Sequence, residues 1–273
     1  MGNSGRRWPL VTVVTPSFNQ AGFLERAIRS VLDQDYPRLE YFVIDGGSAD
    51  GSVDIIRRYA DRLAGWVSEP DRGQADALAK GFRRARGDLL AWINSSDAYE
   101  PGALMRVARA HLDRPASFLF GDVAVIDDED RILGVDTHGH LDLEAMVYEN
   151  VFPLQPGAFW TREAYERCGG IDPTFRYYMD LDLFIRLARC GSMRHVPCVL
   201  ARLRRHGDAK TGQDAGGWAS ERSRILKTYA RPGSPVRFRR AISFAKRLSR
   251  FLADRQWGEV CKLVRYAWNA RFG

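Results

Sequence analysis

The feature that most constrains this fold is a repeated order of apolar strand, aspartate and helix in the first part of the chain. Asp45 ends the apolar run 39–45, Asp71 follows the run 65–68, and Asp97 follows the run 88–94. Strands that alternate with helices predict a largely parallel sheet covered on both faces. Because the carboxyl ends of parallel strands form one edge, where open α/β sheets bind ligands, we expect these carboxylates to gather there.

The remaining pattern extends this fold class. After Pro115 two apolar runs flank the acidic turn 127–130, which predicts a hairpin. We therefore expect an α/β fold whose mixed, mainly parallel sheet is flanked by helices. Strands are predicted at 10–15, 39–45, 65–68, 88–94, 118–126 and 131–135, and helices at 23–32, 52–63, 74–84 and 101–112.

The positive charge belongs to the end of the chain. The segment 234–273 contains ten Lys or Arg and two acids and therefore carries +8, whereas the whole chain carries +7. We divide the chain into a domain at 1–214 and a basic helical region at 215–273. Apolar residues at near-helical spacing over 238–252 alternate with arginines, and a second helix is expected at 257–272. Such a basic amphipathic helix can lie on an anionic membrane surface or pack on the domain, and both alternatives stay open.

Several classes of protein are disfavoured. No run approaches the roughly 18 to 20 apolar residues of a membrane helix, and residues 1–9 lack the apolar middle of a signal peptide. We expect a cytoplasmic protein, with peripheral attachment to the inner face of the membrane as an option. The four cysteines lack the short spacing of a zinc site, and no motif for nucleic-acid recognition accompanies the basic charge. The turn 15–22 lacks the Gly-x-Gly-x-x-Gly of dinucleotide-binding proteins, and no Walker glycine loop is present.

Five motifs occur in series: Thr15-Pro-Ser-Phe-Asn, Ile44-Asp-Gly-Gly-Ser-x-Asp-Gly-Ser, Glu69-x-Asp-x-Gly-Gln, Trp92-Ile-Asn-Ser-Ser-Asp and Met179-Asp-x-Asp-Leu. From about residue 11 to residue 211 the chain resembles family 2 glycosyltransferases of the GT-A fold. The resemblance implies transfer of a sugar from a nucleoside diphosphate sugar to an acceptor hydroxyl, with inversion at the anomeric carbon. It also implies a glycan or lipid-linked acceptor, as in bacterial surface polysaccharide or glycolipid synthesis.

The resemblance also implies where the donor binds. Asp97 would hold a divalent cation, Mn²⁺ or Mg²⁺, with His206 as a possible second ligand; oxygen ligands suit both ions. The acid that usually precedes this aspartate is replaced by Ser95 and Ser96. Asp45 would accept hydrogen bonds from the base or ribose. The donor-binding residues implied in this way are Pro16, Ser17, Asn19, Asp45, Asp71, Gly73, Ser96, Arg204 and Lys210, the last two as cations beside the diphosphate.

Catalysis needs a base that takes the proton of the acceptor hydroxyl. Asp180 aligns with the catalytic carboxylate of the family, although Met179 stands where a glutamate is usual. Asp182 is the alternative, but it is also a typical helix-starting acid. Gln155 is a candidate sugar contact, and Trp160 could stack on a sugar ring or pack in the core. Asp50 is either a helix cap or a ligand contact.

Other functions remain open at this stage. A non-catalytic sugar-nucleotide-binding or scaffold protein would explain the missing acid before Asp97. A membrane-recruited assembly module would place the function in the basic region. A dehydrogenase would require the glycine fingerprint that the chain lacks.

Overall fold

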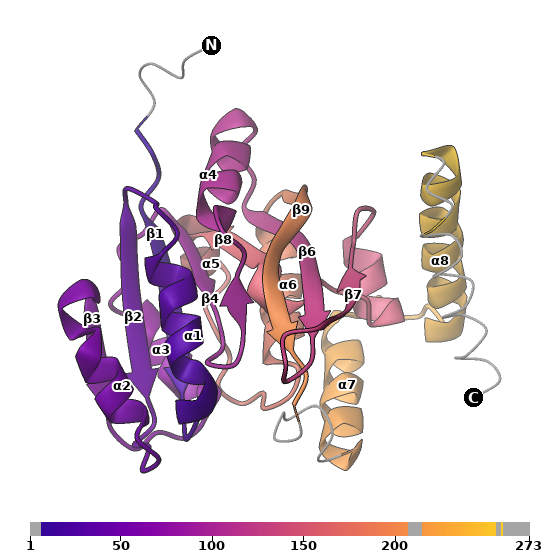
Figure 1. Ribbon diagram of the computed structural model, residues 1–273. Coiled ribbons are helices and arrows are strands. Elements are labelled where there is room, and N and C mark those ends of the chain that lie inside the picture. Colours follow the sequence, from indigo (N-terminus) through magenta and orange to yellow (C-terminus); the bar gives the residue numbers. More distant parts are fainter. Residues whose placement is uncertain (1–6, 207–214, 255–257, 259–273) are drawn as a thin grey trace. The chain divides into compact units, whose positions relative to one another are not determined.

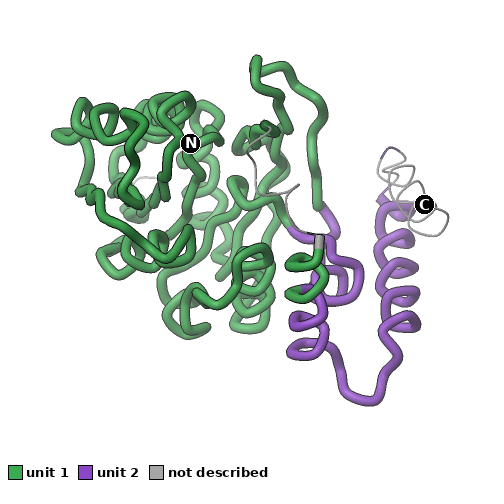
Figure 2. The backbone as a smooth tube through the Cα atoms, turned by 90° about the horizontal axis from the view of Figure 1, so that it is seen from below, with its two compact units in different colours: residues 1–138, 153–221 green, residues 139–152, 222–273 purple. Residues whose placement is uncertain are grey.

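The computed structural model describes residues 7–206, 215–254 and 258. The chain forms two compact units, coloured separately in Figure 2. Unit 1 comprises residues 1–138 and 153–221, and unit 2 comprises residues 139–152 and 222–273. The predicted functional division at residue 214 stays a prediction.

Unit 1 is built on one mixed sheet with the strand order β3-β2-β1-β4-β8-β6-β9-β5, and β7 pairs with β6 (Figure 1). The first four strands in this order are parallel, as the alternation of strands and helices predicts. The strands β8 and β7 pair antiparallel with β6, whereas β9 runs parallel to it. The strand bounds are β1 Val11–Ser17, β2 Leu39–Asp45, β3 Gly65–Ser68, β4 Leu89–Trp92, β5 Ala98–Tyr99, β6 Phe118–Ile126, β7 Ile132–Asp136, β8 Ala158–Thr161 and β9 Met193–Arg204.

Helices connect these strands and cover the sheet. Their apolar stripes face the sheet, so that Leu24, Ile28 and Val31 of the first helix are fully buried. The helix bounds are α1 Ala21–Leu32, α2 Ser52–Arg58, α3 Gln74–Phe82, α4 Ala103–Asp113, α5 Arg162–Arg167, α6 Met179–Cys190 and α7 Ala215–Tyr229, with short 3-10 turns at Ala60–Arg62 and Gln155–Gly157.

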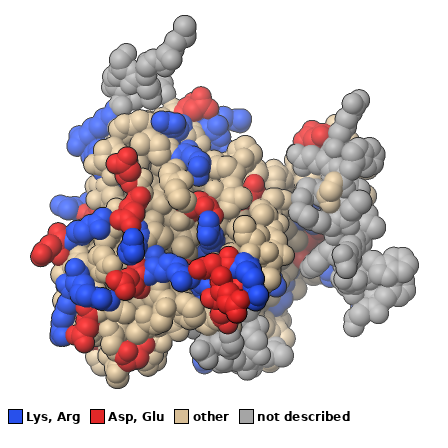
Figure 3. Space-filling view, in the orientation of Figure 1, with Lys and Arg blue, Asp and Glu red and all other residues tan. Residues whose placement is uncertain are grey.

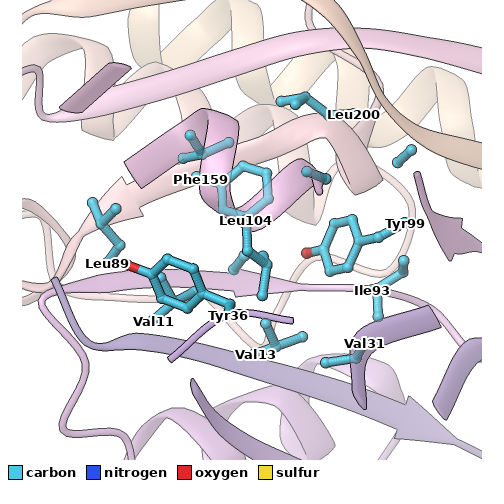
Figure 4. Close-up of a cluster of buried hydrophobic side chains, with 14 of the residues drawn as sticks. Val11, Val13, Val31, Tyr36, Leu89, Ile93, Tyr99, Leu104, Phe159 and Leu200 are labelled. Atoms are coloured by element: carbon cyan, nitrogen blue, oxygen red, sulfur yellow. The ribbon is translucent and has the colours of Figure 1, made fainter. Parts of the chain in front are cut away.

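A large cluster of buried apolar side chains packs against the sheet. Figure 4 shows side chains of β1, β4 and α4 meeting Phe159 of β8 and Leu200 of β9. Val11, Val13 and Leu104 are fully buried there. The strands that alternate most regularly in the sequence thus supply the rigid part of unit 1, and their carboxyl ends carry the loops described below.

Many charged side chains of both signs lie on the face of unit 1 that Figure 3 shows. Figure 3 shows acidic and basic side chains interspersed on this face. Exposed pairs such as Arg58 with Glu25 and Arg62 with Asp33 join neighbouring helices. Such exposed pairs contribute little to stability, but they agree with the near-neutral charge of this part of the chain.

Unit 2 contains the end of α7, the helix α8 Val236–Ala253 and the π-helical turn Ala145–Glu149. The basic amphipathic helix predicted at 238–252 is confirmed as α8, whereas the helix predicted at 257–272 lies outside the described residues. Four basic side chains of α8 are paired with acids of residues 142–149. Lys246 and Arg239 pair with Glu144, Arg247 with Glu149 and Arg250 with Asp142. Within the described part of the chain, no helix combines the length and the apolarity needed to cross a membrane.

Candidate active site

The loops after β1 and β2 are tied together by hydrogen bonds. The backbone N–H of Asn19 donates to Ser48 Oγ at 2.8 Å, and the N–H of Ala49 donates to Asn19 Oδ1 at 3.0 Å. Asn19 adopts φ +49°, which asparagine tolerates better than most residues. The carboxylate of Asp50 accepts from the N–H of Ala21, the first residue of α1, at 2.8 Å. Asp50 therefore binds the start of α1 from the neighbouring loop, which was not predicted, and it also accepts from the N–H of Ser52 at 3.0 Å, at the start of α2, the helix that it was predicted to cap.

Asp45 organises this loop from inside. Its side chain has no exposed surface, and it accepts hydrogen bonds from the N–H groups of Gly47 and Ser48 and from the hydroxyls of Ser48 and Ser68. Its oxygens are thus occupied by the protein. The direct contact with base or ribose predicted for Asp45 stays a prediction; in the structure this carboxylate shapes the loop at the ligand edge.

Asp71 does lie at this edge, against the β2 loop. A Cβ built on Gly46 would stand 2.8 Å from Asp71 Oδ2, so only glycine allows this approach without a shift. Asp71 Oδ1 accepts from the N–H of Gly73 at 2.7 Å. Gly73 has φ +111° and immediately precedes α3, and it remains exposed. The predicted pair Asp71 and Gly73 therefore forms one partly exposed turn beside the β2 loop.

A chain of side-chain hydrogen bonds continues to the predicted metal residue. Gln74 Nε2 donates to Asn94 Oδ1 at 2.6 Å, and Asn94 Nδ2 donates to Asp97 Oδ2 at 3.1 Å. The backbone N–H of Arg204 donates to Asp97 Oδ1 at 3.0 Å. Asp97 is 3% exposed, and burial raises its pKa to about 7. A cation beside it would restore the charged form, since opposite charge favours ionisation.

Arg204 binds other residues of unit 1 through its side chain. Its side chain is 1% exposed, and its guanidinium donates to the carbonyl oxygens of Ser96 and Asp127 and to the carboxylate of Asp130. The group also lies 5.3 Å from the centre of the Phe23 ring. The diphosphate contact predicted for Arg204 stays a prediction, because in the structure this guanidinium joins Ser96 in the loop after β4 to Asp127 and Asp130 in the turn between β6 and β7. Ser96 contributes a backbone oxygen to the same arrangement.

His206 lies beside Arg204 at the end of β9. Its ring centre is 5.1 Å from that of Phe23, and its Nδ1 is buried without a hydrogen-bond partner among the described residues. An imidazole nitrogen without a hydrogen-bond partner, two residues after the Arg204 N–H that binds Asp97, is consistent with the predicted ligand role. No cluster of three or more His, Cys, Asp or Glu occurs within the described ranges, so the protein would supply few of the ligands. Lys210 lies outside the described residues.

The predicted base, Asp180, lies in the first turn of α6. It is half-buried, accepts from the N–H of Leu181 at 2.7 Å, and burial raises its pKa to about 6, with the charge of Glu221 adding to the effect. Asp182, the alternative, is 4% exposed at its side chain and pairs with Arg186 at 2.5 Å. Arg186 also donates to the carbonyl oxygen of Cys168. Asp182 is thus committed to packing, whereas Asp180 remains available. Asp180 shares no direct hydrogen bond with the loops of Asp97 in the described structure.

Gln155 begins the 3-10 turn before β8, and Trp160 lies in β8. Gln155 Nε2 donates to the carbonyl oxygen of Trp92 at 2.6 Å, while its Oε1 is buried without a partner among the described residues. That oxygen could accept from a sugar hydroxyl. Trp160 has no exposed surface and packs against Phe82, Trp92, Tyr165 and Phe184. The sugar-stacking prediction for Trp160 is corrected, and its core-packing alternative is what the structure shows.

The end of β1 contributes three neighbouring residues. Pro16 and Ser17 are buried, and Ser17 lies opposite Asp45 in the sheet register. The Oγ of Ser17 has no partner among the described residues. Phe18, which sequence reasoning missed as a site residue, is 60% exposed. The available signal was an aromatic residue between two predicted donor-binding residues, Ser17 and Asn19, because a nucleobase can stack on an aromatic ring.

Comparisons with known proteins show the family of the chain and its fold. The family description "Glycosyl transferase family 2" matches residues 12–170. The uncharacterized glycosyltransferase Rv1514c of Mycobacterium tuberculosis is 32% identical over 234 residues, which cover 77% of this chain and 87% of the relative. TuaG of Bacillus subtilis, a putative glycosyltransferase of teichuronic acid biosynthesis by its description, is 28% identical over 67% of this chain and 73% of its own length.

Two solved structures share the fold. TarS of S. aureus in complex with UDP-GlcNAc aligns with a TM-score of 0.64 at 14% identity, over 81% of this chain and 71% of that chain. The mannosyltransferase PcManGT of Pyrobaculum calidifontis, in complex with GDP-Man and Mn²⁺, aligns with a TM-score of 0.57 at 22% identity, over 91% and 79%. The fold is therefore of the GT-A type. Together with the family match and the similarity to Rv1514c, this shows that the chain belongs to glycosyl transferase family 2 and is a glycosyltransferase.

Proposed function

We propose that this enzyme transfers a sugar from a nucleoside diphosphate sugar to an acceptor hydroxyl, with inversion at the anomeric carbon. The observation that carries the proposal is the pair of carboxylates Asp97 and Asp180, one beside hydrogen-bonded loops and one available at a helix start. Burial raises the pKa of both. Strongly shifted acids in such positions mark functional sites more often than structural ones.

The donor would bind along the loops after β1 to β4. Ser17 and Asn19 would face the nucleoside, Phe18 would stack on its base, and Asp71 with Gly73 would flank the ribose or diphosphate. The support is the exposure of Phe18 and the orphaned Oγ of Ser17. Gln155 would bind a hydroxyl of the transferred sugar through its unpaired oxygen.

Asp97 and His206 would hold a divalent cation together with the donor diphosphate, and Mn²⁺ in the PcManGT structure supports this choice. Bound there, the ion would neutralise the charge that develops on the leaving diphosphate. Few protein ligands suit an ion that keeps water and phosphate oxygens, as Mg²⁺ usually does. Ser95 and Ser96 in place of an acid predict weak affinity for the ion before the donor binds.

In the transfer step, Asp180 takes the proton of the acceptor hydroxyl. The acceptor oxygen forms a bond to the anomeric carbon as the bond from that carbon to the diphosphate oxygen breaks, and the electron pair leaves with the diphosphate. A carboxylate whose pKa is raised to about 6 is a stronger base than an ordinary aspartate and is still largely ionised at neutral pH.

The acceptor would be a glycan or lipid-linked intermediate of bacterial surface polysaccharide or glycolipid synthesis, and the description of TuaG supports this class. We place the enzyme in the cytoplasm, with α8 binding the inner face of the membrane. No acid occurs in α8, Phe238 and Leu252 are 61% and 41% exposed, and Arg237 and Arg240 are exposed beside them. Exposed apolar and basic side chains on one helix suit an anionic lipid surface.

The transfer proposal is tested by nucleoside diphosphate release from UDP-, GDP- and dTDP-sugars, with Mn²⁺, Mg²⁺ or chelator. The chains compared are wild type, Asp97→Ala, Asp180→Asn and the exposed control Asp54→Asn. We expect metal-dependent release from one donor, loss of it in both site variants, and retention in the control. Donor binding is measured by calorimetry on the same samples. Binding without turnover under every condition would favour the non-catalytic alternative instead.

The membrane proposal is tested by co-sedimentation with vesicles of phosphatidylcholine, with and without about a third phosphatidylglycerol. Wild type is expected to sediment with the anionic vesicles only. Phe238→Ala combined with Arg237→Gln and Arg240→Gln should abolish this, whereas Lys227→Gln, on the exposed side of α7, should not. Equal sedimentation of the triple variant would contradict the assignment to α8.

A further inference from the structure

The residues just before α6 are held by a side chain distant in the sequence. The carboxylate of Glu221, in α7, accepts hydrogen bonds from the backbone N–H groups of Arg176 at 2.7 Å, Tyr177 at 2.9 Å and Tyr178 at 2.9 Å. All of these residues belong to unit 1. The first N–H groups around a helix start lack partners within the helix, so a carboxylate there satisfies donors that would otherwise depend on water.

Aromatic packing reinforces the same contact. The ring of Trp218, three residues before Glu221 in α7, lies 5.0 Å from that of Tyr177 and 4.9 Å from that of Tyr178. Positions three apart lie on one face of a helix. One face of α7 therefore contacts the segment 176–178 through both hydrogen bonds and ring contacts. Tyr178 is followed after one residue by Asp180.

The local sequence around Asp180 does little to position it. Its carboxylate accepts from its neighbour Leu181, and α6 begins at Met179 without a side-chain cap of its own. Glu221 thus holds the three residues that lead into α6, whereas in the first turn of α6 the N–H of Leu181 donates to Asp180 itself. Within the described ranges, Glu221 is also the charged group that adds to burial in raising the pKa of Asp180.

We propose that Glu221 is a positioning residue for the catalytic carboxylate: it fixes the start of α6 from α7 and so sets where Asp180 meets the acceptor hydroxyl. This inference rests on the proposed role of Asp180. It places the beginning of α7, which the sequence pattern assigns to a basic appendage, within the catalytic apparatus. Misplacement of a reacting group by about 1 Å can lower a rate by roughly 100-fold, so the effect is measurable.

The test compares Glu221→Gln and Glu221→Ala with wild type and with Glu163→Gln, an exposed acid on α5. We expect kcat to fall by roughly 10- to 100-fold in Glu221→Ala while the calorimetric Kd for the donor stays within about twofold. In Glu221→Gln we also expect the acid limb of kcat/KM to move to lower pH, because the neutral amide no longer raises the pKa of Asp180. The control should match wild type in both respects.

A merely structural role would give different results. It would lower thermal stability and donor affinity together and leave the acid limb in place, and that outcome would overturn the proposal. If wild type turns over no donor, the transfer proposal has failed, and hydrogen exchange then decides the positioning. The amides of 176–178 and of the first turn of α6 should exchange faster in Glu221→Ala than in wild type and the control. Unchanged exchange there would refute the contact independently of activity.

Discussion

The backbone N–H of Arg204 donates to Oδ1 of Asp97 across 3.0 Å, joining the end of β9 to the loop after β4. The contact uses the main chain, so it does not depend on which side chain stands at position 204. The guanidinium of Arg204 is turned to Ser96, Asp127 and Asp130. Arg204 thus binds Asp97, the candidate metal ligand, through its backbone N–H, and it binds the turn between β6 and β7 through its side chain.

The first prediction concerns pH and Asp97. Burial raises its pKa to about 7, so between about pH 4 and pH 7 the folded chain keeps a proton that the unfolded chain releases. Stability should therefore fall as the pH rises through this window, and Asp97→Asn should flatten the fall. Thermal unfolding from pH 4 to pH 8 measures both curves. Addition of Mn²⁺ and a nucleoside diphosphate at about 100 times Kd should raise the free energy of unfolding at pH 8 by about 2.7 kcal/mol. This gain is expected in wild type only. An equal gain in Asp97→Asn would remove Asp97 from the metal site.

The second prediction tests the structural role of the Arg204 side chain. Arg204→Lys cannot reproduce three donor directions, so the free energy of unfolding should fall by about 1–3 kcal/mol. Donor affinity should change little, because the guanidinium is already committed within the protein. Chemical denaturation and calorimetry measure the two quantities. The matched control is Arg205→Lys, an exposed neighbour that should leave both unchanged. A donor affinity lost without loss of stability would instead support the predicted contact of Arg204 with the diphosphate.

The third prediction separates Asp180 from Asp182. Asp180→Asn should lower kcat by roughly 100-fold or more with donor affinity retained, because a base is removed and no ion pair is broken. Wild-type kcat/KM should fall on the acid side with a midpoint near the pKa of about 6. Asp182→Asn should instead destabilise the fold by roughly 3 kcal/mol, since it removes the charged partner of Arg186 from a buried ion pair. If Asp182→Asn lowered kcat and Asp180→Asn instead lowered stability, Asp182 would be the base.

The fourth prediction concerns the close approach of Gly46 and Asp71. In Gly46→Ala the new Cβ would lie 2.8 Å from Asp71 Oδ2, so the carboxylate must move. We expect a small loss of stability, because the atom that must move is the end of a partly exposed side chain, together with weaker donor binding. Combining Gly46→Ala with Asp71→Gly removes the clash and should recover the stability but not the donor affinity. A double-mutant cycle by thermal unfolding shows whether the two changes couple.

The fifth prediction tests the exposed ring of Phe18. Because its side chain is 60% exposed, Phe18→Ala should leave the melting temperature almost unchanged. If the ring stacks on the nucleobase, donor binding should weaken by about 0.5–1.5 kcal/mol, and Phe18→Tyr should retain it. Competition calorimetry with a nucleoside diphosphate gives the affinities. Unchanged affinity in Phe18→Ala would exclude stacking at this position.

The elements that hold the ligand edge were predictable because their apolar periods are regular. The predicted strand 39–45 equals β2, the strand 65–68 equals β3, and the hairpin appears as β6 and β7. Helix 52–63 was predicted too long, since α2 ends at Arg58 and a 3-10 turn follows. The two-residue strand β5 is too short to carry a period, and the strands β8 and β9 were not predicted either.

Residue roles were less predictable than elements. A motif identifies Asp45 and Arg204 but not all of the partners of their polar atoms, since Ser68 and Asp130 come from distant segments. Trp160 fits the sequence equally well as a sugar platform and as core, and only its four aromatic neighbours decide. Glu221 lies 41 residues after Asp180, a distance over which sequence spacing gives no signal for contact.

The loops after β1 and β2 are already joined by hydrogen bonds from Asn19 to Ser48, and those after β3 and β4 from Gln74 through Asn94 to Asp97. A ligand that meets such an edge need not order it, so little conformational entropy is lost on association. In the proposed function the backbone that receives the base of the donor is thus fixed beforehand, and selectivity for the base would rest on the polar side chains of these loops.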